Sequence, residues 1–376
     1  MTGGEASSEQ PLNLHEYEAA ARAALPPMVF DFVAGGAGDE ATVRANRAAF
    51  ARWSLLPRVL RGAGPATAAT TVLGQPVALP VLVAPTSFHR LVHDGGEPET
   101  ARAARRAGTI YTMGTVSTVA IEEVAPEAGT WWFQLYVYRD RGLTRELAAR
   151  AEAAGAAALV VTIDMPAMGR READERHRFA LPPGLAMANF ASPHQRGLAD
   201  ADTGSGLSDY ARRAALETAL TWADIEELAA STAMPIVPKG ILHPADAVLA
   251  FDHGARAVIV SNHGGRQLDG AVASLDALPA VAEAVAGRGE VLLDGGIRRG
   301  TDVLKALALG ARAVLIGRPV LWGLAAGGVA GVERVLALLR AEIELDLTLC
   351  GLASPEDVGH SLVVPADAPI DGRALR

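Results

Sequence analysis

Residues 290–317 read EVLLDGGIRRGTDVLKALALGARAVLIG, and this stretch decides the fold class. Two apolar runs, Glu290–Gly296 and Ala311–Gly317, have the length of strands. Both are rich in Val, Leu and Ile at successive positions, as a parallel sheet buried on two faces requires. Between them, Asp302–Leu309 has the spacing of an amphipathic helix. The stretch therefore predicts two parallel strands joined by a helix.

The same pattern recurs from residue 80 to about residue 340. The other expected strands are Leu79–Pro85, Thr109–Gly114, Trp131–Tyr138, Ala157–Asp164, Met234–Gly240 and Ala255–Ser261. The other expected helices are Glu97–Ala107, Leu143–Ala154, Trp222–Thr232, Pro244–His253 and Leu275–Ala286. Eight strands with a helix after nearly every one predict an α/β fold, a closed (βα)8 TIM barrel. A doubly wound sheet is the alternative, but residues 84–88, APTSF, lack the glycine fingerprint of that fold.

The whole chain, 1–376, is expected to form a single domain with a barrel over 76–345. Residues 1–75 are helical in pattern around Leu14–Leu25 and Asp39–Phe50, and we expect them to cap the barrel. The connection at 165–233, after the fourth strand, is far longer than an ordinary loop. We favour a mobile lid over a tolerated surface insertion for this connection. Residues 346–376 form a C-terminal tail.

Composition excludes several classes of function. The chain has 34 basic and 43 acidic residues, a net charge of −9 and no basic stripe, which excludes a nucleic-acid binder. Its apolar runs are too short to span a bilayer, and no signal peptide or haem-binding domain precedes the barrel pattern, so we expect no membrane partner. A single cysteine, Cys350, favours a cytoplasmic location. Only two residues are lysine, Lys239 and Lys305, and Lys239 is the better candidate for chemistry because it ends an apolar run.

Polar residues gather where the expected strands end, which is the catalytic face of such a barrel. They are Thr86, Ser87, Thr115, Gln134, Tyr136, Thr162, Asp164, Lys239, Ser261, Asn262, His263, Asp294 and Arg318. Any one of them could be a helix cap or a turn residue. Their convergence on one rim indicates an active site.

The last two strand ends have the character of a phosphate site. Asp294-Gly295-Gly296 with Arg298 follows the seventh strand, and Gly317-Arg318 follows the eighth. Glycines let backbone N–H groups approach an anion, and guanidinium groups bind it through two hydrogen bonds. Turn glycines with solvated arginines would explain either loop alone, but the two loops together favour a phosphorylated ligand.

The densest group of candidate residues is the heptapeptide SNHGGRQ at 261–267. His263 at a strand end can act as a base near neutral pH, and two glycines leave space beside it. Arg266 is placed to hold an anionic substrate near that base. A structural histidine is the alternative interpretation, and the flanking glycines and arginine favour catalysis.

This heptapeptide resembles the signature of the FMN-dependent α-hydroxy-acid oxidase and dehydrogenase family, and the resemblance covers nearly the whole chain. The matching motifs, in order, are Ala84-Pro85-Thr86, Phe133-Gln134-Leu135-Tyr136, Thr162-Ile163-Asp164, Gly169-Arg170-Arg171-Glu172, Lys239-Gly240, Asp294-Gly295-Gly296 and Gly317-Arg318-Pro319. The resemblance implies FMN as cofactor, a 2-hydroxy acid as small-molecule substrate, O2 as electron acceptor and a homo-oligomer, a tetramer or octamer.

The resemblance also assigns roles to residues. It implies that His263 takes a proton from the substrate, that Asp164 stabilises the resulting imidazolium and raises the pKa of His263, and that Tyr136 donates a hydrogen bond to the substrate. Arg171 and Arg266 would bind the substrate carboxylate, and Lys239 would stabilise negative charge on the reduced flavin. The remaining cofactor contacts would come from Pro85, Thr86, Ser87, Gly114, Gln134, Thr162, Ser261, Asp294, Gly295, Gly296, Arg298, Gly317 and Arg318.

Three positions depart from the usual family pattern. Phe32 replaces a tyrosine that hydrogen-bonds the substrate carboxylate, Gly114 replaces a frequent serine, and Val116 replaces the tryptophan of glycolate-type members. Loss of a donor and of a bulky wall favours a larger, more apolar substrate, and residues 32–38 resemble those of hydroxymandelate oxidases. A small aliphatic substrate or an acceptor other than O2 stays open.

Other signals receive structural interpretations. His89 and His93 lack a third ligand, so a structural role is favoured over a metal site, and no metal is expected. Gly35-Gly36-Ala37-Gly38 is interpreted as a helix C-cap and turn, and Trp131-Trp132 as packing residues. A flavin-free isomerase or lyase and a catalytically inactive binding protein are the alternatives from other classes.

Overall fold

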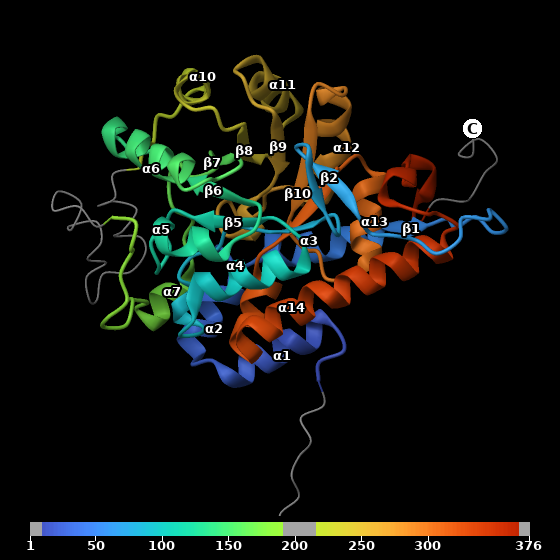
Figure 1. The fold of residues 1–376 in the computed structure, drawn as a ribbon, viewed down its shortest axis with the longest axis horizontal. Coiled ribbons are helices and arrows are strands. Elements are labelled where there is room, and N and C mark those ends of the chain that lie inside the picture. The colour runs from blue at the N-terminus through green and yellow to red at the C-terminus, as the bar shows by residue number, and fades with distance from the viewer. Residues whose placement is uncertain (1–9, 191–215, 368–376) are drawn as a thin grey trace, which may run out of the picture.

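The computed structural model describes residues 10–190 and 216–367, and its centre is a closed barrel of eight parallel strands (Figure 1). The strands are β4 (Val81–Val83), β5 (Tyr111–Gly114), β6 (Trp131–Leu135), β7 (Leu159–Thr162), β8 (Ile236–Ile241), β9 (Ala257–Val260), β10 (Glu290–Asp294) and β11 (Ala313–Ile316). Each strand pairs with its neighbours in chain order, and β11 closes the ring against β4. The predicted fold class is confirmed, and every barrel strand overlaps an expected apolar run, with β8 extending one residue beyond it to Ile241.

Helices follow the strands and cover the outside of the barrel. The expected helices are present as α4 (Gly96–Ala107), α6 (Arg141–Ala153), α10 (Trp222–Ser231), α11 (Pro244–Asp252), α12 (Ser274–Val285) and α13 (Gly300–Ala308). A short helix, α5 (Ile121–Val124), stands between β5 and β6. Local chemistry fixes several helix starts: the Asp140 carboxylate accepts from the N–H groups of Gly142 and Leu143 at the start of α6.

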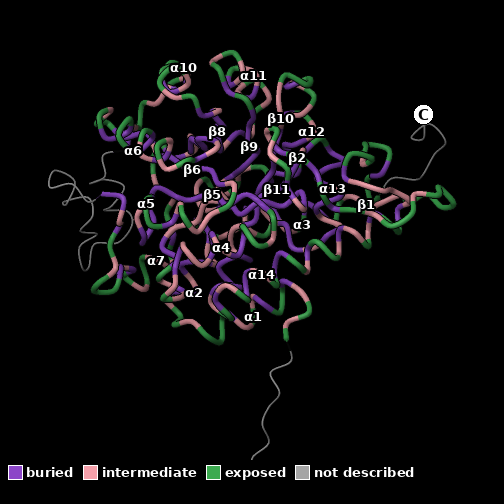
Figure 2. The backbone as a smooth tube through the Cα atoms, in the orientation of Figure 1, coloured by how far each residue is buried: buried purple, intermediate pink, exposed green. Residues whose placement is uncertain are grey.

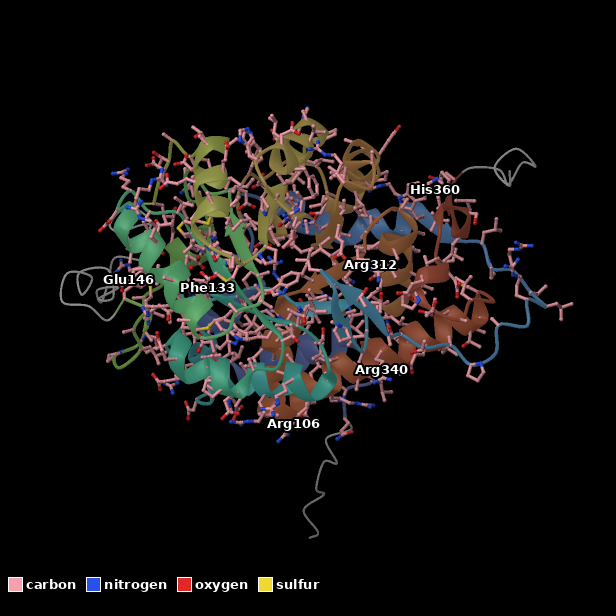
Figure 3. All side chains as sticks on the ribbon, turned by 45° about the horizontal axis from the view of Figure 1, so that its top comes forward. Arg106, Phe133, Glu146, Arg312, Arg340 and His360 are labelled. Atoms are coloured by element: carbon pink, nitrogen blue, oxygen red, sulfur yellow. The ribbon has the colours of Figure 1, made fainter. Side chains whose placement is uncertain are left out.

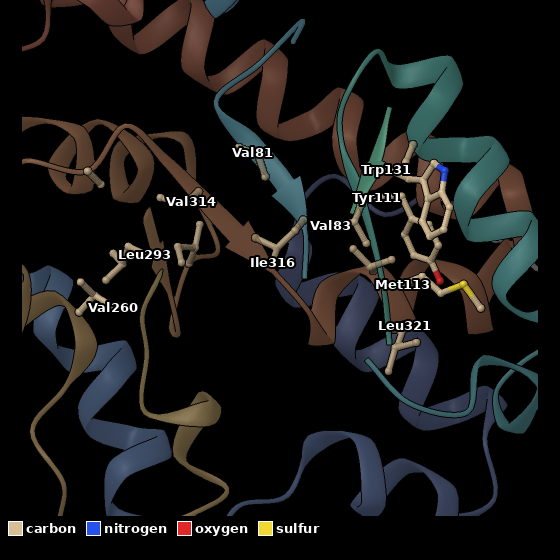
Figure 4. Close-up of a cluster of buried hydrophobic side chains, with 14 of the residues drawn as sticks. Val81, Val83, Tyr111, Met113, Trp131, Val260, Leu293, Val314, Ile316 and Leu321 are labelled. Atoms are coloured by element: carbon tan, nitrogen blue, oxygen red, sulfur yellow. The ribbon is translucent and has the colours of Figure 1, made fainter. Parts of the chain in front are cut away.

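Alternate residues of each strand enter two separate apolar layers. Leu82, Val160, Ile259, Leu292 and Leu315 fill the barrel interior together with Trp132. The other set packs between strands and helices, where Val81 and Val83 of β4 lie beside Val314 and Ile316 of β11 (Figure 4). Both tryptophans of the pair Trp131-Trp132 are buried, as the packing interpretation predicts. Buried backbone therefore forms the centre of the molecule and exposed backbone its periphery (Figure 2).

The N-terminal segment contributes three helices, α1 (Leu14–Ala24), α2 (Pro27–Ala34) and α3 (Ala41–Ala48). Helix α2 contacts α7 (Glu172–His177), in the connection after β7, and α3 contacts the short 3-10 turn η4 (His263–Gly265) after β9. Both helices therefore lie over the carboxyl ends of the strands, as a cap does. Gly35 is the C-cap of α2, as expected.

The segment before the barrel is not wholly helical, and here the sequence prediction is incomplete. The hairpin of β2 (Thr70–Val72) and β3 (Gln75–Val77) places Val72 and Val77 against the interior layer. A second small sheet pairs β1 (Trp53–Leu55) with β12 (Val363–Pro365), which joins the described part of the C-terminal tail to the N-terminal segment.

The longest helix is α14 (Arg318–Leu349), which the apolar runs of the sequence do not anticipate. Its backbone departs from helical angles at Gly327 and Gly328. Within the described residues it is the one helix that is long and apolar enough to cross a membrane, but 56% of its most apolar window is buried. It packs against α1, α4 and α13, as a core helix does. Charged side chains such as Arg106 and Arg340 point outward, whereas Phe133 lies among the strands (Figure 3).

The long connection at 165–233 contains α7 and α10. The segment at 191–209, on which the lid prediction depends, lies outside the described residues.

Candidate active site

A cavity of about 1290 Å³, its open mouth included, lies at the carboxyl ends of the barrel strands. The predicted site residues that line it are Phe32, Pro85, Thr86, Ser87, Gly114, Val116, Gln134, Tyr136, Thr162, Arg171, Lys239, His263, Arg266, Asp294, Gly295, Gly296, Arg298, Gly317 and Arg318. Asp164 and Ser261 do not line it. Ser261 was predicted to contact the cofactor, and this contact stays a prediction; its hydroxyl accepts hydrogen bonds from Lys239 Nζ and from the His263 backbone N–H, both at 3.0 Å.

His263 stands on a strained turn directly after β9. Its φ is +59°, a left-handed value that costs a β-substituted residue about 1 kcal/mol or more, and Gly264 and Gly265 continue at +64° and +76°. A Cβ on Gly265 would lie 2.7 Å from the backbone nitrogen of Val43, so glycine is required where α3 approaches this turn. Asn262 anchors the turn to α3: its side-chain amide and that of Asn46 each donate one hydrogen bond of 2.8 Å to the other.

The His263 imidazole is fixed by a carboxylate behind it. His263 Nδ1 lies 2.9 Å from Asp164 Oδ1, and Gln267 Nε2 donates to the Asp164 backbone carbonyl at 2.9 Å. Burial lowers the pKa of His263 by more than Asp164 raises it, so the net shift is downward. The expected effect of the carboxylate is present, since Asp164 acts to raise this pKa, but desolvation of the imidazolium outweighs it. The ring is neutral at pH 7, with Nε2 free to accept a proton.

The carboxylate itself stays ionised. Burial favours its neutral form, but the charges of His263 and Lys239 and the hydrogen bond from His263 together lower the pKa of Asp164. Its second oxygen, Oδ2, is buried and has no hydrogen-bond partner among the described residues. Asp164 can thus stabilise an imidazolium that forms on His263.

Lys239 is the buried ammonium of the site. It follows Pro238 in β8, is 5% exposed, and its Nζ lies 3.0 Å from Asp294 Oδ2 at the end of β10. Burial opposes the charge, but Asp294 and Asp164 raise the pKa of Lys239, so it remains an ammonium. The prediction that Lys239 and not Lys305 belongs to the site is supported, since Lys305 donates to the Phe50 carbonyl on the outside of the barrel.

The floor of the cavity between β4 and β7 is built from neutral hydrogen-bonding groups. Gln134 Nε2 donates to Thr162 Oγ1 at 2.9 Å, and its Oε1 accepts from the Thr115 N–H. Thr86 Oγ1 lies 2.7 Å from His89 Nε2. His89 is fully buried and bonded on both ring nitrogens, so its role is structural, and the described residues contain no group of three metal-ligating side chains.

Two guanidinium groups and a phenol face the imidazole. Arg171 precedes α7, is 9% exposed, and its Nη1 lies 3.8 Å from Asp174. Arg266 is held by the end of α2, because its Nη1 donates to the carbonyls of Phe32 at 2.9 Å and Gly35 at 2.7 Å. Burial, with the like charges of Arg171 and Arg318, puts the pKa of Arg266 well below its usual range. Such buried cations call for an anion.

Tyr136 directly follows β6 and keeps its proton. Burial and the charge of Asp164 raise the pKa of its phenol. It can therefore donate a hydrogen bond to a ligand in the cavity.

The loops after β10 and β11 form the basic end of the cavity. Gly295 and Gly296 have φ of +98° and +89°, and a Cβ on Gly296 would lie 2.1 Å from the Asn46 carbonyl oxygen. Burial lowers the pKa of Arg298 to about 9 and that of Arg318 to about 10. Arg318 also ties α14 to α2, since its Nε donates to the Ala34 carbonyl at 3.0 Å and its Nη2 to the Gly35 carbonyl at 2.8 Å.

Unpartnered polar atoms test which ligand the cavity fits. Asp294 Oδ1, an acceptor, and Arg171 Nε and Arg298 Nε, both donors, are buried without a hydrogen-bond partner among the described residues. A ligand that carries hydroxyl groups, an anion and a large polar ring would satisfy both kinds of atom. FMN has a ribityl chain, a phosphate and an isoalloxazine ring, so the residues present fit it.

Part of the cavity lining is apolar. Phe32 stacks on Phe179, with ring centroids 4.2 Å apart, and Val116 is 3% exposed. Met165, Met168 and Leu216 complete this wall, and sequence reasoning missed all three. The methionines follow β7 within the motif Met165-Pro166-Ala167-Met168, so their closeness to a strand end was the available signal.

Fold and site together show a (βα)8 barrel whose cavity brings a histidine, two arginines and a basic, glycine-rich end together, as an enzyme of anionic substrates would. A family model described as FMN-dependent dehydrogenase matches residues 21–365. The chain belongs to this family, and its cofactor is FMN. A flavin-free isomerase or lyase is thereby set aside.

The relatives are oxidases of 2-hydroxy acids. The chain is 51% identical over 358 residues to an L-lactate oxidase of Nostoc sp., covering 94% of this chain and 98% of the relative. It is 47% identical to the glycolate oxidase of Spinacia oleracea, with 97% and 98% covered. Among solved structures, mandelate oxidase with (S)-4-hydroxymandelic acid superimposes with a TM-score of 0.88 at 46% identity, covering 93% and 97% of the two chains. The protein is thus an FMN-dependent 2-hydroxy-acid oxidase by family.

Proposed function

We propose that the substrate is an (S)-2-hydroxy acid with an aryl side chain, of the mandelate or 4-hydroxymandelate kind, and that O2 accepts the electrons. The observation that carries this proposal is the apolar wall of Phe32, Val116 and Leu216 in the cavity, with Phe179 stacked on Phe32. An aromatic ring of the substrate would pack against this wall while its carboxylate meets the guanidinium groups. The match to mandelate oxidase structures supports the same choice.

The reaction follows from the charges of the site. Arg171 and Arg266 bind the substrate carboxylate, and the Tyr136 phenol donates to its oxygen. His263 Nε2 takes up one proton of the substrate, and Asp164 stabilises the imidazolium at Nδ1. FMN bound in this cavity would supply the acceptor for the two electrons and the second hydrogen that leave the carbinol carbon. Lys239 stabilises the negative charge that this transfer brings to the cofactor cavity.

O2 is the final acceptor of the two electrons. Overall, one 2-hydroxy acid and one O2 give one 2-oxo acid and one H2O2. We further propose a cytoplasmic homo-oligomer. Light scattering of the purified protein tests the oligomeric state.

Substrate and acceptor are tested together. The value of kcat/KM is measured in air for (S)-mandelate, (S)-4-hydroxymandelate, L-lactate and glycolate, with peroxide determined in parallel. We expect the aryl acids to exceed the small acids by about tenfold or more, the scale on which an apolar pocket discriminates, and peroxide to match the substrate consumed. A preference for lactate or glycolate would overturn the aryl assignment, and turnover without peroxide would overturn O2 as acceptor.

A further inference from the structure

Arg298 is a buried cation that no carboxylate neutralises. It is 8% exposed, and the one hydrogen bond that its guanidinium makes among the described residues runs from Nη1 to the carbonyl of the preceding residue, Ile297, at 2.8 Å. Within residues 10–190 and 216–367 no carboxylate lies within ion-pair distance of it, and its Nε has no partner. The cations Arg47 and Arg318 act against its charge more strongly than the carboxylates of Glu18 and Asp302 favour it.

The group that does contact the guanidinium is an indole. Arg298 Cζ lies 4.6 Å from the centroid of the Trp322 ring. Trp322 is fully buried, and its own Nε1 has no hydrogen-bond partner in the described chain. The tryptophan therefore acts on Arg298 through its ring face and not through its N–H. A cation over an indole face is the strongest form of this interaction among aromatic side chains.

The fold explains why the indole reaches this place. Helix α14 begins at Arg318, in the loop after β11, and Trp322 follows one turn later. Arg298 comes from the other basic loop, after β10. One helix start thus supplies Arg318 to the cavity and, four residues on, the ring on which the second arginine rests.

We propose that Trp322 is a positioning residue for the cofactor phosphate: its ring holds the Arg298 guanidinium in place and stabilises its charge before the phosphate arrives. Without the ring, the side chain of Arg298 would be free to turn toward solvent and away from the like charges of Arg47 and Arg318. The phosphate would then have to order it on binding. This inference rests on the FMN cofactor and is independent of which hydroxy acid is oxidised.

The test compares two ligands that differ only in the phosphate. Full-length apoprotein is titrated with FMN and with riboflavin, and flavin fluorescence gives each Kd. We expect Trp322→Met, which keeps apolar volume but removes the ring face, to weaken FMN about tenfold and to leave riboflavin unchanged. Trp322→Phe keeps a smaller, weaker face and should cost FMN about threefold.

Two further variants serve as controls. Phe251→Met removes the ring under Arg288, a cation–ring contact of 5.7 Å away from the cavity, and should change neither Kd. In an Arg298→Met background, Trp322→Met should have no additional effect on FMN, because the partner through which it acts is gone.

Equal losses of FMN and riboflavin affinity would show a role in folding the cavity only and would overturn the proposal. So would an unchanged FMN Kd in Trp322→Met, or full additivity in the double variant. If Trp322→Met does not fold, Trp322→Phe decides alone: a loss confined to FMN supports the proposal, and an equal or absent loss refutes it.

Discussion

Replacing Asp164 by asparagine tests the catalytic pair by two readouts at once. The Asp164–His263 contact of 2.9 Å is charge-assisted when the imidazole is protonated. Two unit charges about 4 Å apart at the edge of a protein interact by about 4 kcal/mol at an effective dielectric constant near 20. Since the imidazolium is only partly formed in the transition state, we take about 3 kcal/mol as the loss. This corresponds to a fall of about 100-fold in the rate constant of flavin reduction.

The pH profile supplies the second readout. His263 must be neutral to accept a proton, so reduction accelerates as pH rises through its pKa. Burial lowers that pKa and Asp164 raises it. Asparagine removes the raising effect and keeps the burial, so the pKa falls further and the acid limb moves to lower pH. A general loss of folding would lower the rate of flavin reduction without moving the acidic side of its pH profile to lower pH.

The assay is anaerobic stopped-flow reduction of the bound flavin by substrate across pH. The FMN Kd should not change, because Asp164 does not line the cavity. Asp31→Asn is the matched control, since Asp31 pairs with His177 at 2.8 Å outside the cavity, and it should leave both rate and profile as they are. An unchanged rate in Asp164→Asn, or a limb that moves to higher pH, would refute the roles assigned to the pair.

Three other predictions concern single positions. Phe32→Tyr introduces a hydrogen-bond donor near the substrate carboxylate, so we expect the kcat/KM ratio of lactate to mandelate to rise about tenfold. An unchanged ratio would show that Phe32 does not determine substrate selectivity. His263→Ala and His263→Gly should both abolish flavin reduction with FMN still bound, and because φ is +59° the glycine variant should be about 1 kcal/mol more stable than the alanine variant in denaturant titrations. Gly265→Ala places a methyl group against the Val43 backbone and should lower the free energy of unfolding by about 3 kcal/mol. Gly270→Ala, with φ of +86° and open space around it, should lower it by only about 1 kcal/mol. Equal losses in the two variants would contradict the close approach of α3.

The barrel was predictable because its signal is local. Each strand is a short run buried on both faces, and each run shows its own composition. The pairing of β1 with β12 was not predictable, because two strands of three residues each, far apart in the chain, carry no local signal of their partner. Helix α14 was missed for another reason: its glycines and alanines at 323–331 dilute the apolar periodicity that marks a helix.

The site was predictable where its residues end strands. His263, Lys239 and Asp294 were assigned on that ground, and the structure brings them to one cavity. The hydrogen bond from Lys239 to Ser261 was not predictable, since sequence position does not tell a side chain that faces the ligand from one that holds its neighbour. The reciprocal Asn46–Asn262 amide pair was also invisible, because its two members are 216 residues apart.

The N-terminal helix α2 is part of the active site and not only a cover over it. The carbonyls at its C-terminal end are the negative pole of the helix, and Arg266 and Arg318 donate to them. The Phe32 carbonyl accepts from Arg266, while the Phe32 ring lies 5.3 Å from the same guanidinium and stacks on Phe179. Phe32 thus holds Arg266, the cation assigned to the substrate carboxylate, and also provides the ring assigned to the substrate side chain. A change in the position of α2 must therefore alter substrate charge recognition and side-chain selectivity together.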